Sequence, residues 1–126
     1  MKKKLFLNNA QLKAELGRCL NCAAKPCHKA CPAGCNPNEF INFALAGKWE
    51  DAAFSILRAN PLGQVCGLVC PDKFCMKSCA RKALDFSLNI PKIQATILQK
   101  VLSNPAFRLQ SAAKLNGKRV AVIGAG

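Results

Sequence analysis

Cysteine is the residue of this chain whose number and spacing could do chemistry, because nine occur in 126 residues. Eight of them form two short runs with no more than four residues between neighbours. The runs are Cys19-x2-Cys22-x4-Cys27-x3-Cys31-Pro32 and Cys66-x3-Cys70-x4-Cys75-x3-Cys79. Thiolates this close together can converge on an iron–sulfur cube, since short loops between ligands wrap around its faces. The spacing therefore predicts an iron–sulfur protein.

The end of the first run predicts how the thiols are shared. In bacterial two-cluster ferredoxins, a Cys-x2-Cys-x2-Cys-x3-Cys-Pro run sends its fourth cysteine to the other cluster. Cys31-Pro32 closes the first run in the same way, after a wider second gap. We therefore expect two [4Fe–4S] clusters whose ligands are exchanged between the runs, which would hold the two halves of the domain together.

Zinc and disulfides are the alternatives to iron–sulfur clusters. Structural zinc sites usually combine two Cys-x2-Cys knuckles, or a cysteine pair with a histidine pair. Here Cys19 and Cys22 form the only such knuckle, and His28 is the only histidine. We expect His28 to lie near the ligands or on the surface and not to bind metal. A zinc-stapled helical module for binding or docking, without redox function, is the alternative to an electron-transfer domain.

Features of the N-terminus argue against a secreted disulfide scaffold. The basic start, Met1-Lys2-Lys3-Lys4, is followed by only three apolar residues before Asn8, and a signal peptide needs about 7–15. No window approaches the roughly 20 apolar residues of a membrane span. These observations predict a cytoplasmic protein with no membrane partner.

The formal net charge of +13 raises the question of nucleic-acid binding. The basic residues are scattered along the chain, however, and no helix-turn-helix or zinc-finger spacing accompanies them. We predict no nucleic-acid partner. The excess positive charge could offset negatively charged clusters or attract an acidic partner domain.

Helical periodicity surrounds the cysteine runs. Residues 9–18 predict a short helix with Asn9 as its N-cap, and residues 36–60 predict two helices with a turn at Gly47. Asn60, before a proline, closes the second of these. A further helix opens at Asn89-Ile90-Pro91 and ends at Asn104. The large aromatic residues of the middle segment are predicted to pack in the core: Phe40, Phe43, Trp49 and Phe54.

The motifs around the cysteines resemble a known family. They are Arg18-Cys19-Leu20-Asn21-Cys22, Pro26-Cys27-His28-Lys29-Ala30-Cys31-Pro32, Asn60-Pro61-Leu62-Gly63 and Val65-Cys66-Gly67-Leu68-Val69-Cys70-Pro71. This pattern is similar to the N-terminal cluster domain of dihydropyrimidine dehydrogenase and to the start of the small subunit of NADPH-dependent glutamate synthase. The resemblance covers roughly residues 15–126. It implies an all-α, ferredoxin-like domain with two [4Fe–4S] clusters.

The resemblance also implies which residues hold each cluster. One set is Cys19, Cys22, Cys27 and Cys79, and the other is Cys31, Cys70, Cys75 and Gln94. Gln94 occupies the position of a glutamine ligand in dihydropyrimidine dehydrogenase, and it favours the pyrimidine-reducing branch. Cys66 matches a position that is not a ligand and Cys35 has no counterpart, so we expect both to pack in the interior.

The C-terminal residues 111–126 predict a connector followed by the first strand of a second domain, which leaves residues 1–110 as the helical iron–sulfur domain. Val120 to Gly126 is a buried-strand pattern that runs into Gly-x-Gly, and its position matches the start of the family's FAD domain. Gly124 and Gly126 are therefore candidate cofactor-binding residues of a truncated Rossmann-type fold. The chain is expected to be a fragment that does not bind FAD by itself.

The resemblance implies electron relay within an NAD(P)H-dependent flavoenzyme. In the family, NAD(P)H reduces one FAD, and electrons then travel through the clusters toward a second flavin in a partner domain or catalytic subunit. We expect no acid–base or nucleophilic catalytic residue here, and the fragment alone is not expected to be catalytic. The final substrate and the choice of NADH or NADPH remain open.

Overall fold

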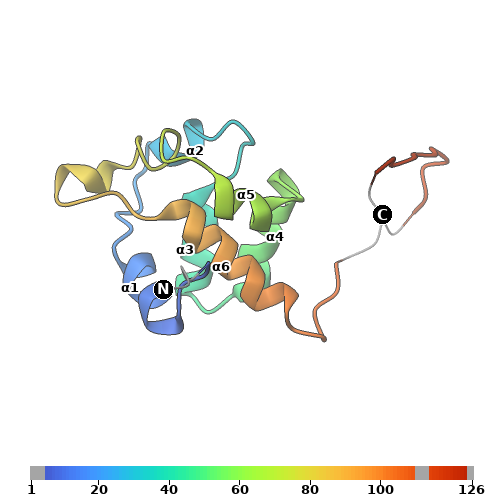
Figure 1. The fold of residues 1–126 in the computed structure, drawn as a ribbon, viewed down its shortest axis with the longest axis horizontal. Helices are drawn as coiled ribbons and strands as arrows, with labels where there is room; N and C mark the ends of the chain where they lie inside the picture. Colours follow the sequence, from blue (N-terminus) through green and yellow to red (C-terminus); the bar gives the residue numbers. More distant parts are fainter. Residues whose placement is uncertain (1–4, 110–113, 125–126) are drawn as a thin grey trace.

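The computed structural model describes residues 5–109 and 114–124, and its regular elements are all helical. Figure 1 shows short helices grouped around one central helix, α6. The expected all-α class is confirmed. In chain order the elements are α1 (Asn9–Gly17), α2 (Pro26–Lys29), α3 (Pro37–Leu45), α4 (Trp49–Ala59), α5 (Gly63–Val69), a 3₁₀ turn (Ala80–Ala83) and α6 (Ile90–Leu102).

Asparagine side chains start three of the helices. Asn8 caps α1: its Oδ1 accepts a hydrogen bond from the backbone N–H of Gln11, and Gln11 Oε1 accepts one from the backbone N–H of Asn8. The expected cap, Asn9, is therefore wrong by one residue, because only Asn8 has the extended backbone that a cap requires. The side chains of Asn36 and Asn89 cap α3 and α6 by accepting hydrogen bonds from the backbone N–H groups of Glu39 and Lys92, and each helix has a proline in its first turn.

The middle of the chain forms the expected helical hairpin of α3 and α4, which pack against each other. Gly47 makes the turn with a φ of +74°, a left-handed conformation that costs glycine little. Asn60 ends α4 in an extended conformation, as its place before a proline requires.

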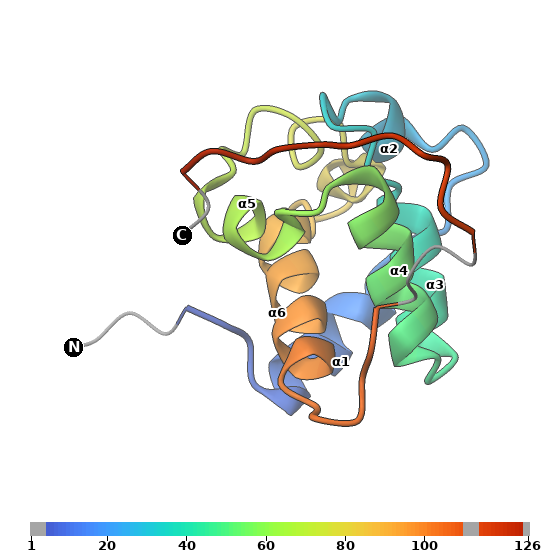
Figure 2. The same ribbon diagram turned by 90° about the vertical axis from the view of Figure 1, so that its right-hand side faces the viewer.

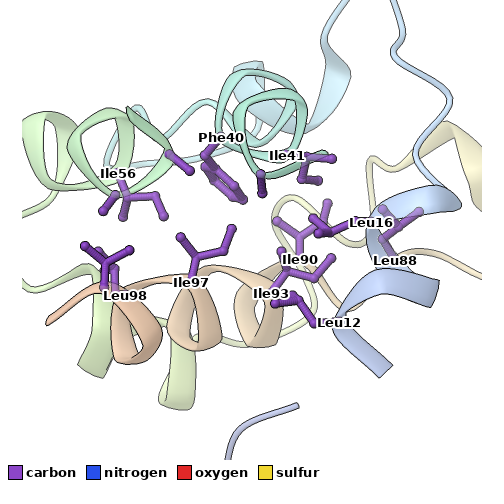
Figure 3. Close-up of a cluster of buried hydrophobic side chains, with 14 of the residues drawn as sticks. Leu12, Leu16, Phe40, Ile41, Ile56, Leu88, Ile90, Ile93, Ile97 and Leu98 are labelled. Atoms are coloured by element: carbon purple, nitrogen blue, oxygen red, sulfur yellow. The ribbon is translucent and has the colours of Figure 1, made fainter. Parts of the chain in front are cut away.

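The core lies between α6 and the α3–α4 hairpin, and α1 closes one side (Figure 3). Ile93, Ile97 and Leu98 of α6 are fully buried and face Phe40 of α3 and Ile56 of α4. The predicted core role of the other aromatic residues is confirmed, because they pack as partly buried side chains against the same core: Phe43, Trp49 and Phe54.

The two cysteine-bearing stretches meet at one end of this bundle. Figures 1 and 2 both place the loops around α2 beside the loop that joins α5 to α6, at the top of each view. The helices thus form a scaffold on which two irregular, cysteine-rich loops face each other.

The strand expected at the C-terminus is not formed. Residues 120–124 have no regular structure, and Val120, Val122 and Ile123 are at least three-quarters exposed. A buried strand needs neighbouring strands for its backbone hydrogen bonds, and none exists among the described residues. Gly124 has a φ of +86°, and Gly126 lies outside the described residues. Within the described ranges, no helix is long and apolar enough to cross a membrane.

Candidate iron–sulfur sites

The first site is a hollow lined by four thiols, Cys19, Cys22, Cys27 and Cys79, and is called here the Cys19 site. Two of the thiols, Cys19 and Cys22, come from the loop between α1 and α2, and Cys27 lies in α2 itself. The fourth comes from the far end of the second run, immediately before the 3₁₀ turn. The structure thus brings together the set of cysteines that the family resemblance implied for one cluster.

Left-handed backbone shapes the loop of the Cys19 site. Asn21 and Lys25 have φ values of +49° and +47°, which non-glycine residues rarely adopt. Asn21 is held there because its Oδ1 accepts hydrogen bonds from the Nδ2 groups of Asn38 (2.7 Å) and Asn42 (2.9 Å) on α3. Burial raises the pKa of the Cys19 thiol, and the backbone N–H of Asn21 acts in the opposite direction and lowers it. The N–H group can therefore stabilise a thiolate at that position.

Arg18 fixes the two ends of the Cys19 site to each other. Its guanidinium bonds Glu15 at 2.8 Å and Asp85 at 3.2 Å, and it lies 4.0 Å from the centre of the Phe86 ring. Arg81 also binds Asp85, at 2.9 Å, and these two arginines hold the pKa of the Asp85 carboxyl well below its usual range. Because Arg18 precedes Cys19 and the Asp85 loop follows Cys79, this network keeps both cysteines in the same hollow.

The second site is a cavity of about 160 Å³, called here the Cys31 site, whose lining includes five cysteines and Gln94. The cysteines are Cys31, Cys35, Cys66, Cys70 and Cys75. Cys31, Cys70, Cys75 and Gln94 are the set that the resemblance implied. Cys35 is buried as expected, but Cys66 is only partly buried, and the position of both thiols in this cavity was not foreseen.

Two glycines allow α5 to lie against α6 beside the Cys31 site. A Cβ on Gly67 would lie 2.6 Å from the Pro91 carbonyl oxygen and 2.9 Å from the backbone nitrogen of Ala95. A Cβ on Gly63 would meet Ile56 at 2.5 Å. The close approach lets Gln94 Nε2 donate a 2.7 Å hydrogen bond to the Gly63 carbonyl oxygen. This bond fixes the orientation of the amide group of Gln94 and engages its nitrogen. The Oε1 atom of Gln94 is then the atom of this amide that can act as a ligand at the cavity.

Burial and mutual repulsion raise the pKa values of several thiols in the two sites. Burial, and then the neighbouring thiols of Cys70 and Cys31, raise the pKa of Cys75 to about 12. Burial is also the main cause that raises the pKa of Cys19 and of Cys27, and thiols of the same site add to it. Such thiols cannot all ionise side by side unless positive charge enters between them. A cationic metal core supplies that charge and displaces the protons.

The two sites are neighbours. Ile90 lines both of them, and it is 3% exposed. The Cys27 thiol of one site also contributes to the raised pKa of Cys75 in the other. One buried aliphatic side chain therefore forms part of the wall between the two groups of thiols.

The donor sets fit an iron–sulfur cube better than a single ion. Four sulfurs around one zinc ion each lie about 2.3 Å from it. Within residues 5–109 and 114–124, no three His, Cys, Asp or Glu side chains converge closely enough to hold one metal ion. Cysteines spread around a hollow, with soft sulfur donors, match the ligands of a cube whose irons are separated from one another.

The contacts of Asn21 with two asparagines of α3, and the network of Arg18, Arg81 and Asp85, were not predicted from the sequence. Asn38 and Asn42 are one helical turn apart, which is a visible signal, but nothing in the sequence points to Asn21 as their partner. His28 lies beside the ligands, as expected, and its Nδ1 donates a 3.0 Å hydrogen bond to the backbone carbonyl of Cys35.

A small helical domain with two adjacent thiol-lined sites is typical of the class of cysteine-ligated metalloproteins. The chain belongs to the family described as dihydropyrimidine dehydrogenase domain II, 4Fe-4S cluster, whose profile matches residues 2–105. The resemblance of the sequence motifs to this family is thereby confirmed, and an electron-transfer role is supported for the domain.

Curated relatives point to the same family. The chain is 38% identical over 113 residues to the NAD-dependent dihydropyrimidine dehydrogenase subunit PreT of Salmonella typhimurium, covering 89% of this chain and 27% of the relative. The Escherichia coli K12 protein of the same name is 37% identical over the same length and shares. The glutamate synthase [NADPH] small chain of Escherichia coli K12 is 33% identical over 120 residues, or 94% and 25%. The chain spans about a quarter of the length of these relatives.

Proposed function

We propose that this chain is an electron-transfer domain that holds two [4Fe–4S] clusters, one at the Cys19 site and one at the Cys31 site. When bound, such clusters supply one-electron redox steps at potentials set by their ligands and surroundings. The observation that supports the proposal is the distribution of the thiols: one hollow is lined by the first proposed ligand set, and the other by the second set together with Cys35 and Cys66.

The chain's own residues have three tasks in this function. Cys19, Cys22, Cys27 and Cys79 bind one cluster, and Cys31, Cys70, Cys75 and Gln94 bind the other. The backbone N–H of Asn21 opposes the rise that burial causes in the pKa of the Cys19 thiol, which favours its thiolate. Ile90 excludes water from the space between the sites, so that electrons move between two close, shielded centres.

Exposure differs between the two sites. Cys70 is exposed, whereas Cys79 is buried. Close to Cys70, α5 and the residue before it present a face of exposed apolar side chains, Leu62, Val65 and Val69. We infer that the Cys31 site exchanges electrons with a partner across this face, because large exposed apolar side chains at a functional site are typical of contact surfaces.

The longer protein to which this domain would belong is an NAD(P)H-dependent flavoenzyme. The relatives whose names carry "NAD-dependent" and "[NADPH]" are four times as long as the matched region, which leaves room for FAD and nicotinamide sites. One relative is called a subunit and another a small chain, so a flavin-containing catalytic subunit is the partner proposed here.

Anaerobic reconstitution with iron and sulfide tests the two-cluster function. The wild-type chain should bind about eight irons and become brown, and Cys19→Ser and Cys70→Ser should each retain about four. The double variant should lose nearly all of them. Matched control variants at cysteines outside the proposed ligand sets, such as Cys66→Ser, should keep about eight.

Zinc binding is the outcome that would overturn the proposal. A colourless anaerobic preparation with stoichiometric zinc and no iron would favour the zinc-stapled docking module instead. Unchanged iron content in both Cys19→Ser and Cys70→Ser would show that the proposed ligand sets are wrong, even if the chain proved to bind iron in another way.

A further inference from the structure

Asn38 is a buried polar side chain of α3 to which the proposed ligand sets give no task. It is 9% exposed and lines the Cys19 site, although it lies outside both cysteine runs. A buried amide needs hydrogen-bond partners, because burial without them costs free energy. Asn38 Nδ2 donates a 2.7 Å hydrogen bond to the Oδ1 of Asn21, which lies between Cys19 and Cys22. The partner of this buried amide is therefore the loop that carries two of the proposed ligands.

Asn42 lies one helical turn after Asn38 and adds a second contact to the same atom. Its Nδ2 group donates to the Oδ1 of Asn21 at 2.9 Å and to the backbone carbonyl oxygen of Asn38 at 2.8 Å. The Oδ1 atom of Asn21 therefore accepts hydrogen bonds from two amides on one face of α3. Two bonds from a regular helix fix the position of this side chain more closely than either bond alone.

The backbone of Asn21 has a conformation that needs such support. Its φ of +49° is left-handed, a region that only glycine adopts without cost and in which other residues persist when the surrounding structure holds them. Residue 21 directly precedes Cys22, so a change in its φ would redirect the chain there and move the Cys22 thiol relative to that of Cys19. The geometry of this pair of thiols thus depends on the conformation of residue 21.

Lys25 shows a different way of holding left-handed backbone in the same loop. Its φ is +47°, and no side-chain hydrogen bond caps the helix that follows it. Its backbone N–H instead donates to the Cys22 carbonyl oxygen, and its own carbonyl oxygen accepts from the N–H of His28, each at 3.1 Å. Within residues 5–109 and 114–124, the backbone of Asn21 forms no backbone–backbone hydrogen bond. Side chains of α3 therefore do for Asn21 what the backbone does for Lys25.

We propose that Asn38 is a positioning residue of the Cys19 site, which together with Asn42 holds Asn21 in its left-handed conformation and so keeps Cys19 and Cys22 at one hollow. Asn38 does not bind the cluster but acts through the loop. None of the three asparagines lines the Cys31 site, so that site gains nothing from the contact. Loss of the Asn38 amide should speed cluster loss from the Cys19 site alone. The inference rests on the two-cluster function proposed above.

Iron release to a chelator tests this role at each site separately. By the proposed ligand sets, reconstituted Cys70→Ser holds only the cluster of the Cys19 site, and Cys19→Ser holds only that of the Cys31 site. An anaerobic excess of ferrozine then gives the rate of iron release from each chain. Asn38→Ala should raise this rate about tenfold in the Cys70→Ser chain, because unsupported strain at one residue is worth about that factor. It should leave the rate unchanged in the Cys19→Ser chain.

Substitutions of Asn21 separate its conformation from its contacts. Glycine adopts positive φ without support, and residue 21 is exposed, so water can replace the lost oxygen as partner of the α3 amides. Asn21→Gly in the Cys70→Ser chain should therefore release iron at nearly the unsubstituted rate. Alanine disfavours positive φ, so Asn21→Ala should release iron about tenfold faster. Adding Asn38→Ala to Asn21→Gly should cause no further increase, because the side chain that it held is gone.

The conformation of residue 21 can also be measured without iron. A residue with positive φ gives a strong nuclear Overhauser effect between its own amide and α protons, because these two protons are then close together. In the reduced, iron-free chain this signal should be strong at Asn21 and at Lys25. Asn38→Ala should weaken it at Asn21 alone, so that Lys25 serves as the control within the same spectrum.

Several results would overturn the proposal. Equally faster iron release from both single-cluster chains of Asn38→Ala would reduce its effect to one of general stability. Equal release rates in Asn21→Gly and Asn21→Ala would refute the conformational argument, and these variants at an exposed residue decide the matter if Asn38→Ala does not fold. A weak signal at residue 21 in the wild-type spectrum would do the same. A wild-type chain that takes up no iron would instead refute the two-cluster function, whereas the iron-free spectra would still test the hold on Asn21.

Discussion

Gly67→Ala should destabilise the chain and damage one site selectively. The added Cβ would lie 2.6 Å from the Pro91 carbonyl oxygen, about 0.8 Å short of ordinary contact, and 2.9 Å from the Ala95 backbone nitrogen. Both obstacles are backbone atoms of α6 and cannot rotate away. Overpacking usually lowers the free energy of unfolding by about 1–3 kcal/mol, and because the neighbours here are rigid we expect a loss of about 3 kcal/mol.

The same substitution should push α5 away from α6. Cys66 lies on α5, Cys70 directly follows α5, and Gln94 lies on α6. Iron content after reconstitution should therefore fall from about eight toward four as the Cys31 site loses its geometry. The Cys19 site, which uses neither helix for its thiols, should stay filled.

Anaerobic urea denaturation of the iron-free, reduced chain, followed by circular dichroism, measures the stability change. Gly17→Ala is the matched control, because a Cβ on Gly17 meets no atom within 4 Å. This control should raise the free energy of unfolding, by up to about 1 kcal/mol, since alanine favours the helix. Equal stability and equal iron content in the two variants would refute the packing argument.

The remaining predictions concern the core, the amide and the thiols. Ile97→Ala, at a fully buried position, should lower the free energy of unfolding by about 3–4 kcal/mol in urea titrations, whereas the half-exposed Leu102→Ala should cost less than about 1 kcal/mol. Gln94→Cys should keep both clusters and lower one midpoint potential in a redox titration, because a thiolate makes that cluster more negative; two unchanged potentials would exclude Gln94 as a ligand. The pKa values of Cys35 and Cys75, raised to about 12 from 9.0, mean that unfolded chains release these protons first. The iron-free chain should therefore lose stability between about pH 9 and 12, by up to about 1.4 kcal/mol per pH unit and thiol, and a flat profile would contradict this.

The helices could be predicted because their signals are local. Asparagine and proline mark the starts of α3 and α6, and a glycine with positive φ marks the turn at Gly47. The C-terminal strand could not be judged in this way, because an apolar run such as Val120–Ile123 becomes a strand only when other strands pair with it.

The candidate sites were predictable only in part. Spacing indicated clusters and an exchange of ligands, since short gaps between cysteines limit which thiols can converge. Spacing could not show that Cys35 lines the same cavity as Cys31, because that depends on the turn at Gly34 and on the hydrogen bond from His28 to the Cys35 carbonyl. It also could not show the contacts of Asn21 with Asn38 and Asn42, because these residues lie 17 and 21 positions further along the chain and meet only in the tertiary structure.

The position of Cys79 beside Cys19, Cys22 and Cys27 has a consequence for how the protein is made. A cluster bound there, as proposed, would close a loop of about 50 residues, and by the chain-entropy treatment of cross-links such a closure would lower the free energy of folding by about 4 kcal/mol. No peptide that ends before residue 79 could complete the proposed ligand set. Cluster insertion would therefore follow synthesis of almost the whole domain, and oxidative loss of iron would release both cysteine loops at once, which would expose that end of the bundle to proteases.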